Sequence, residues 1–85
     1  MAKHRHSFVE TYDGFLGFGY NRQTDENTIR CYLQKFSDDQ LMEVLIPRLT
    51  GGELEEIFAL VSRLLKSHLA ENEYHRHFLK DSHGQ

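Results

Sequence analysis

The stretch that most constrains the fold of this chain is the segment TGGELEEIFALVSRLLKSHL, Thr50–Leu69. Its large apolar residues recur at steps of three and four, the spacing that places side chains on one face of an α-helix. The set consists of Leu54, Ile57, Phe58, Val61, Leu64 and Leu65, with His68 on the same face and Leu60 and Leu69 at its edges. So wide an apolar stripe predicts a central helix that packs against several elements at once.

The start and the charges of this segment support the same helix. Thr50 and Glu53 have the spacing of a capping box, in which each side chain accepts a hydrogen bond from the other residue's backbone N–H. Charged residues are sorted along the helix as its dipole favours. Glu53, Glu55 and Glu56 come first, whereas Arg63, Lys66 and His68 come last. His68 lies on the apolar stripe, which predicts a hydrogen-bonded core or interface histidine.

The N-terminal segment Ser7–Tyr20 is rich in aromatic residues and supports two interpretations. Alternating β-formers around Asp13-Gly14 favour a hairpin with a tight turn. The helical period instead places Phe8, Val9, Tyr12, Phe15 and Leu16 on one face of a short helix. Ser7 and Glu10 would form its capping box, and Gly17 would end it. Both remain open, and both require the aromatic rings to pack on the helices or on a partner.

Further helices are predicted on either side of the central one. One begins at Thr24 or Asp25 and runs to about Phe36, with Ile29, Tyr32, Leu33 and Phe36 on its buried side. Cys31 points away from that side and is expected to be partly exposed and chemically inert. Ser37 is expected to cap a third helix that ends near Pro47, because proline lacks the N–H that helix continuation needs. A last short helix is predicted within residues 70–81, either continuing the central helix or folding back at once.

These elements predict an all-α fold. Its form is a small bundle of three to four helices around the long central helix at about residues 51–69. The aromatic, glycine-containing N-terminal segment packs on that helix. The whole chain, residues 1–85, is expected to be a single domain with flexible ends at 1–6 and 82–85.

The small size of the chain points to self-association. Eighty-five residues build a core of limited stability, which disulfides, a metal or oligomerisation often supplement. Cys31 is the only cysteine, so no disulfide can form within one chain, and a lone thiol fits a cytoplasmic protein. No apolar run reaches the roughly 20 residues that span a bilayer, and the N-terminus lacks the pattern of a signal peptide. We therefore expect a cytoplasmic homodimer with no membrane segment.

Catalysis has little support in the sequence. The glycines Gly14, Gly17 and Gly19 are not followed by the Lys-Ser/Thr pair of a phosphate-binding loop. Asp38 and Asp39 are adjacent, diverge on a helix, and are explained as residues near a helix start. No nucleophile, base and orienting group can be placed together from their spacing. We expect neither an enzyme nor a cofactor.

Histidines and basic residues near the two ends suggest two alternative functions. His-Arg-His occurs twice, and His75 and His77 could contribute to a metal site, with Glu73 or Asp81 one turn from His77. We expect these histidines to be solvated surface residues, because the sequence has no dense set of metal ligands.

A basic cluster of Lys3, Arg5, Arg76 and Lys80 suggests a nucleic-acid-associated regulator. Against this, the formal net charge is −3, and the glutamates at the start of the central helix would repel phosphates. Nucleic acid is therefore the less favoured partner.

The function that these features favour is a non-enzymatic protein–protein interaction or regulatory module that acts as a homodimer and binds an unidentified protein partner. Buried aromatic and aliphatic side chains are typical anchors of interfaces. The expected interface combines the N-terminal aromatic segment with one side of the central helix. Its anchors are Phe15, Phe18, Tyr20, Phe58 and Leu65.

Overall fold

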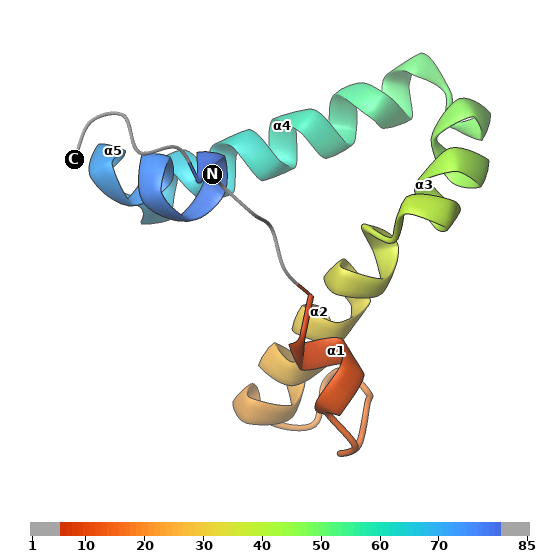
Figure 1. The fold of residues 1–85 in the computed structure, drawn as a ribbon, viewed down its shortest axis with the longest axis vertical. Coiled ribbons are helices and arrows are strands. Elements are labelled where there is room, and N and C mark those ends of the chain that lie inside the picture. Colours follow the sequence, from red (N-terminus) through yellow and green to blue (C-terminus); the bar gives the residue numbers. More distant parts are fainter. Residues whose placement is uncertain (1–5, 81–85) are drawn as a thin grey trace. The chain divides into compact units, whose positions relative to one another are not determined.

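The computed structural model describes residues 6–80, and helices are the only regular elements in that range (Figure 1). The predicted all-α fold class is confirmed, with five α-helices and three-quarters of the residues in that range helical. The chain divides into two compact units, the first ending at Arg48 and the second beginning at Leu49. The first contains α1, α2, α3 and η1, and the second contains α4, α5 and η2. Whether the chain behaves as one domain stays a prediction.

In the first unit, short polar side chains start the helices. Helix α2 spans Arg22–Phe36, and Asn21 caps it by accepting a hydrogen bond from the Thr24 N–H at 2.8 Å. Helix α3 spans Asp39–Leu45 and is capped by Asp38 rather than by Ser37. Pro47, near which this helix is predicted to end, lies within η1, a 3-10 turn at Ile46–Arg48. The predicted starts are thus off by one to four residues, because several neighbouring residues could each serve as a cap.

The N-terminal segment forms a short helix rather than a hairpin. Helix α1 spans Phe8–Thr11, and no strand occurs between residues 6 and 80. Beyond α1 the backbone is irregular, and side chains of α2, rather than a second strand, form hydrogen bonds with its backbone groups. The Thr28 hydroxyl donates to the Gly17 carbonyl at 2.8 Å and accepts from the Gly17 N–H at 2.9 Å. In the same way the Gly19 N–H donates to Asp25, and the Val9 N–H donates to Gln34.

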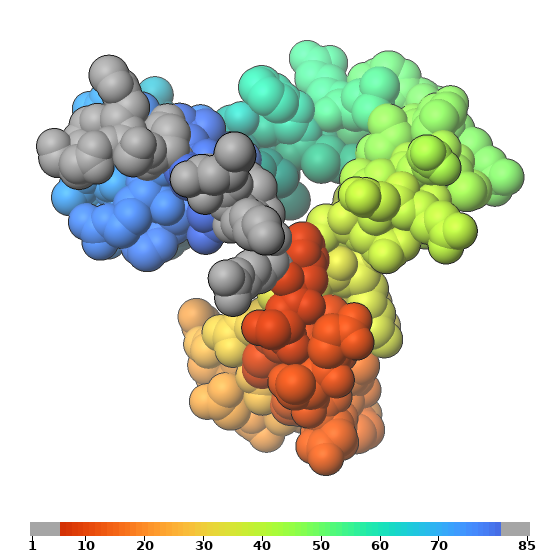
Figure 2. All heavy atoms as spheres, viewed as in Figure 1, coloured from red at the N-terminus to blue at the C-terminus, as the bar shows by residue number. Residues whose placement is uncertain are grey.

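These contacts decide which face of α2 is buried. Figure 2 shows α1 (red) lying against α2 (orange to yellow), and Thr28 and Cys31 are the two buried residues of that helix. The prediction that Cys31 is partly exposed is wrong, since only 2% of its surface is accessible. The predicted buried side is also wrong for Ile29, Tyr32 and Leu33, which are exposed. The N-terminal segment packs on the polar side of α2, opposite these exposed apolar residues, because the polar side chains there form hydrogen bonds with its backbone.

In the second unit, α4 spans Gly51–His68 and begins as the sequence predicts. Thr50 Oγ1 accepts from the Glu53 N–H at 3.1 Å, and the Glu53 carboxylate accepts from the Thr50 N–H at 2.9 Å. The predicted capping box is therefore confirmed. Leu69 is extended and ends the helix.

The last helix folds back at once instead of continuing α4. It consists of α5, Glu71–Glu73, followed by η2, a π-helical segment at Tyr74–Leu79. The Glu73 carboxylate accepts from the Ala70 N–H at 2.7 Å and so fixes the start of this return. Lys80, with φ of 58°, closes it in the left-handed conformation.

Replacing Thr28 by valine tests the link between the N-terminal segment and α2. Thr28→Val keeps the shape of the side chain but leaves the N–H and carbonyl of Gly17 without their partner. We expect the free energy of unfolding to fall by about 1–3 kcal/mol, measured by urea denaturation at fixed protein concentration. Thr28→Ser, which keeps the hydroxyl, is the matched control. Equal stability of Thr28→Val and the unmodified protein would contradict this role.

Replacing Thr50 by alanine tests the capping box. The substitution leaves the Glu53 N–H unpaired at the start of α4, and we expect a loss of about 1 kcal/mol in the free energy of unfolding. Thr50→Ser retains an acceptor oxygen and should lose much less. Thermal or urea unfolding followed by circular dichroism measures the difference. If both variants unfold alike, the cap does not stabilise the helix.

Candidate interaction surface

The apolar face of α4 is largely open to solvent. None of the residues of α4 is buried, and Phe58 exposes 74% of its surface. Four aliphatic side chains on this face are exposed as well: Leu54, Leu60, Val61 and Leu64. An apolar stripe of this width on a helix normally lies against other elements. Contiguous exposed apolar surface on a small protein marks a site of association.

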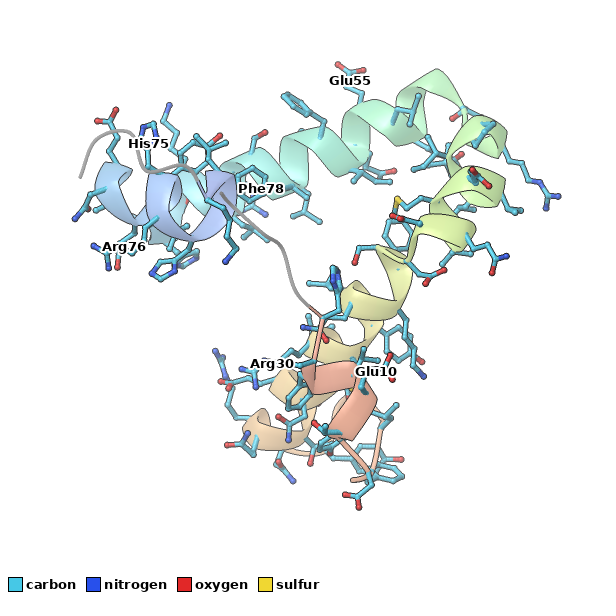
Figure 3. All side chains as sticks on the ribbon, in the orientation of Figure 1. Glu10, Arg30, Glu55, His75, Arg76 and Phe78 are labelled. Carbon is cyan, nitrogen blue, oxygen red and sulfur yellow. The ribbon has the colours of Figure 1, made fainter. Side chains whose placement is uncertain are left out.

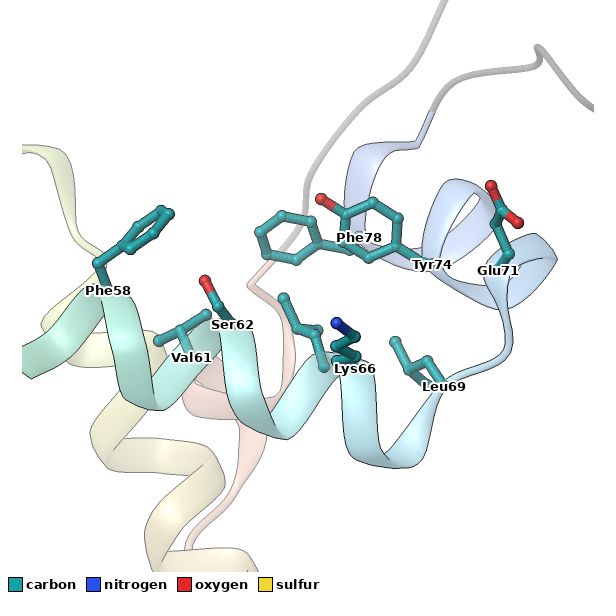
Figure 4. Close-up of a pocket in the computed structure, with 9 residues that line it drawn as sticks. Phe58, Val61, Ser62, Lys66, Leu69, Glu71, Tyr74 and Phe78 are labelled. Atoms are coloured by element: carbon teal, nitrogen blue, oxygen red, sulfur yellow. The ribbon is translucent and has the colours of Figure 1, made fainter.

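The return of the chain after α4 covers one flank of this face and forms a groove (Figure 4). Tyr74 and Phe78 stack with ring centroids 5.3 Å apart and lie over the last turns of α4. The groove holds about 530 Å³. Its apolar lining consists of Phe58, Val61, Leu65, Leu69, Tyr74 and Phe78. Ser62, Lys66 and Glu71 contribute the polar atoms of its wall. The groove suits an apolar side chain or helix rather than a charged ligand.

A second apolar surface lies on α2, on the side opposite Cys31. Phe18, Ile29 and Leu33 are exposed there and line a shallow hollow. Arg22 and Glu26 form an ion pair of 2.6 Å at its edge. The hydrogen bond and charge of Glu26 raise the pKa of the Arg22 guanidinium above its ordinary value. Both side chains are solvated, so the pair stabilises the fold little.

The predicted interface anchors are distributed over both units. Phe15, Phe18 and Tyr20 lie on the irregular segment between α1 and α2, and each exposes 60% or more of its surface. Phe15 and Tyr20 contact each other edge to face, with centroids 5.0 Å apart. Phe58 and Leu65 both lie on α4, where Leu65 is half-buried in the groove. Whether these five side chains act together stays a prediction.

Two sets of residues were missing from that prediction. Leu60 and Leu64 extend the open face of α4, and Ile29 and Leu33 form the open face of α2. The helical period identifies all four as apolar positions of a helix. It does not tell whether another part of the chain covers them, so the sequence alone predicts apolar positions but not their exposure.

The basic residues and histidines do not converge on one site within residues 6–80. Lys3 and Arg5 lie outside the described residues, Arg76 is exposed, and Lys80 is half-buried. His75 and Arg76 project from η2 in different directions (Figure 3). The His75 ring contacts the ring of Tyr74, with centroids 5.8 Å apart, and His77 is exposed.

The remaining histidines leave the metal hypothesis without support from the geometry. The His6 ring contacts the hydroxyl of Ser37. His68 is exposed, so a place in the core of the single chain is wrong for it, whereas a place in an interface stays a prediction. Across the described part of the chain, no three His, Cys, Asp or Glu side chains come close enough to hold a metal ion. Asp81, one of the candidate ligands, lies outside that part.

Comparison of the chain with models of protein families, with curated proteins and with solved structures gave no match. Among the described residues, none of the helices combines the length and the apolar character needed to cross a bilayer.

Proposed function

We propose that this protein is a non-enzymatic interaction or regulatory module of the cytoplasm that acts as a homodimer. The observation that carries the proposal is the open apolar face of α4, a well-capped helix with no buried residue. Its packing partners in the second unit are short, because α5 and η2 together contribute only residues 71–79. Most of the stability of a helix in a protein comes from the packing of its apolar face, so α4 gains stability from further apolar contacts.

The chemistry of the exposed residues supports association rather than catalysis. The groove on α4 is lined mainly by aliphatic and aromatic side chains, and the hollow on α2 combines three apolar side chains with charged ones that include the Arg22–Glu26 ion pair. Large aromatic and aliphatic groups provide most of the binding energy of protein interfaces. A free, buried Cys31 is compatible with the reducing environment of the cytoplasm.

The mass of the protein in solution tests this proposal. We expect sedimentation equilibrium at micromolar concentration to give twice the mass of one chain, because a second copy covers the apolar face of α4. Leu64→Asp places a charge on that face and should shift the equilibrium to the monomer. The matched control is Ala59→Asp, which adds the same charge to an exposed position on the opposite side of the same helix. A single-chain mass for the unmodified protein would refute the homodimer.

A further inference from the structure

We infer that α4 pairs with α4 of a second copy in antiparallel orientation, about a two-fold axis between Leu60 and Val61. The inference rests on the proposed homodimer and specifies which surfaces meet and in which direction. It follows from the part of the apolar face that the second unit leaves open, and from the order of the charges beside it.

The open part of the face lies on the flank of α4 away from the groove. Tyr74 and Phe78 stand over the flank that contains Ser62, Leu65 and Lys66. At 100° per residue, Ile57, Leu60 and Leu64 lie on the other flank, and Val61, which also lines the groove, lies where the two flanks meet. Three of these are exposed and Ile57 is half-buried.

This set of four is symmetric along the helix. Leu60 and Val61 lie equally far from the midpoint between them, and so do Ile57 and Leu64. A two-fold axis at this midpoint places Ile57 of one copy against Leu64 of the other, and Leu60 against Val61. A closed dimer requires such a self-complementary surface, since both copies present the same patch.

The charges beside this flank select the antiparallel direction. Glu53 and Glu56 precede the four apolar residues, whereas Arg63 lies between Val61 and Leu64. Antiparallel pairing places Glu56 near Arg63 of the second copy. Parallel pairing would bring the glutamates of the two copies together. Opposite charges across an interface fix its orientation and register, and like charges disfavour the alternative.

The helix dipoles act in the same sense. In the antiparallel pair, the positive start of each helix lies beside the negative end of the other. A second copy therefore complements this flank in shape, in charge and in dipole. An unrelated apolar helix would need only the first of these.

Distances between spin labels test the direction of pairing. Single labels are attached at Glu56→Cys and Ser67→Cys, two exposed positions beside the proposed seam, in a chain in which Cys31 is replaced by alanine, and the two labelled variants are mixed. With a rise of 1.5 Å per residue, the label at 56 of one copy and the label at 67 of the other are offset along the helix by about 3 Å in the antiparallel pair. In a parallel pair the same offset is about 17 Å. We expect a short distance in the mixture and longer distances in each labelled variant alone, where the offset is about 14 Å at position 56 and about 20 Å at position 67.

A dimer in which the mixture gives no shorter distance than the singly labelled variants would overturn the antiparallel arrangement and leave the proposed homodimer intact. A dimeric mass without a short distance in any of the samples would show that another surface joins the copies. A monomeric mass of the labelled and unlabelled protein would overturn both proposals. The two proposals can therefore fail separately.

A charge-exchange pair of variants provides a second test that does not depend on labels. Glu56 and Arg63 are seven residues apart, about 10 Å along the helix, and therefore do not contact each other within one chain. Glu56→Lys alone and Arg63→Glu alone each place like charges opposite one another in the antiparallel dimer. We expect each to raise the dimer dissociation constant severalfold, and the double variant to return to within about twofold of the unmodified protein. Additive effects of the two substitutions would overturn the pairing.

Discussion

The fold depends on how the apolar face of α4 is kept from water. The helix has a strong local start at Thr50 and Glu53, but most of the stability of a helix in a protein comes from the packing of its apolar face. Burial of apolar surface contributes roughly 25 cal/mol per Å², which makes side-chain packing the main source of its stability. The return of the chain through α5 and η2 covers only one flank of the last turns. The other flank stays open to solvent, and the proposed homodimer would cover it.

The first unit is stabilised in a different way. Its N-terminal segment is attached to α2 by hydrogen bonds from backbone groups to Thr28, Asp25 and Gln34, together with the stacking of Arg30 on the Phe8 ring. Side-chain hydrogen bonds satisfy an irregular backbone that has no strand to pair with. Because these polar groups occupy one side of α2, its apolar side remains open. Both units of the chain therefore present apolar helix surface to solvent.

These two surfaces differ in what they can recognise. The flank of α4 is symmetric in its apolar residues and has Glu56 and Arg63 beside it, which suits the proposed pairing with a second copy of the same helix. The surface of α2 mixes Phe18, Ile29 and Leu33 with a solvated ion pair and has no such symmetry. In the proposed homodimer this surface of α2 would be left for a different partner.

The sequence by itself determined the features that depend on neighbours three or four residues apart. The capping box at Thr50, the length of α4 and the presence of its apolar stripe are local, so the residue pattern contains them. The helix–hairpin choice for Ser7–Tyr20 and the buried side of α2 required the tertiary structure. Both depend on hydrogen bonds such as those between Thr28 and Gly17, whose partners are 11 residues apart. Periodicity shows which face of a helix is apolar, but only the contacts between elements decide whether that face is covered. For that reason Cys31 is buried while Leu33, on the apolar side, is exposed.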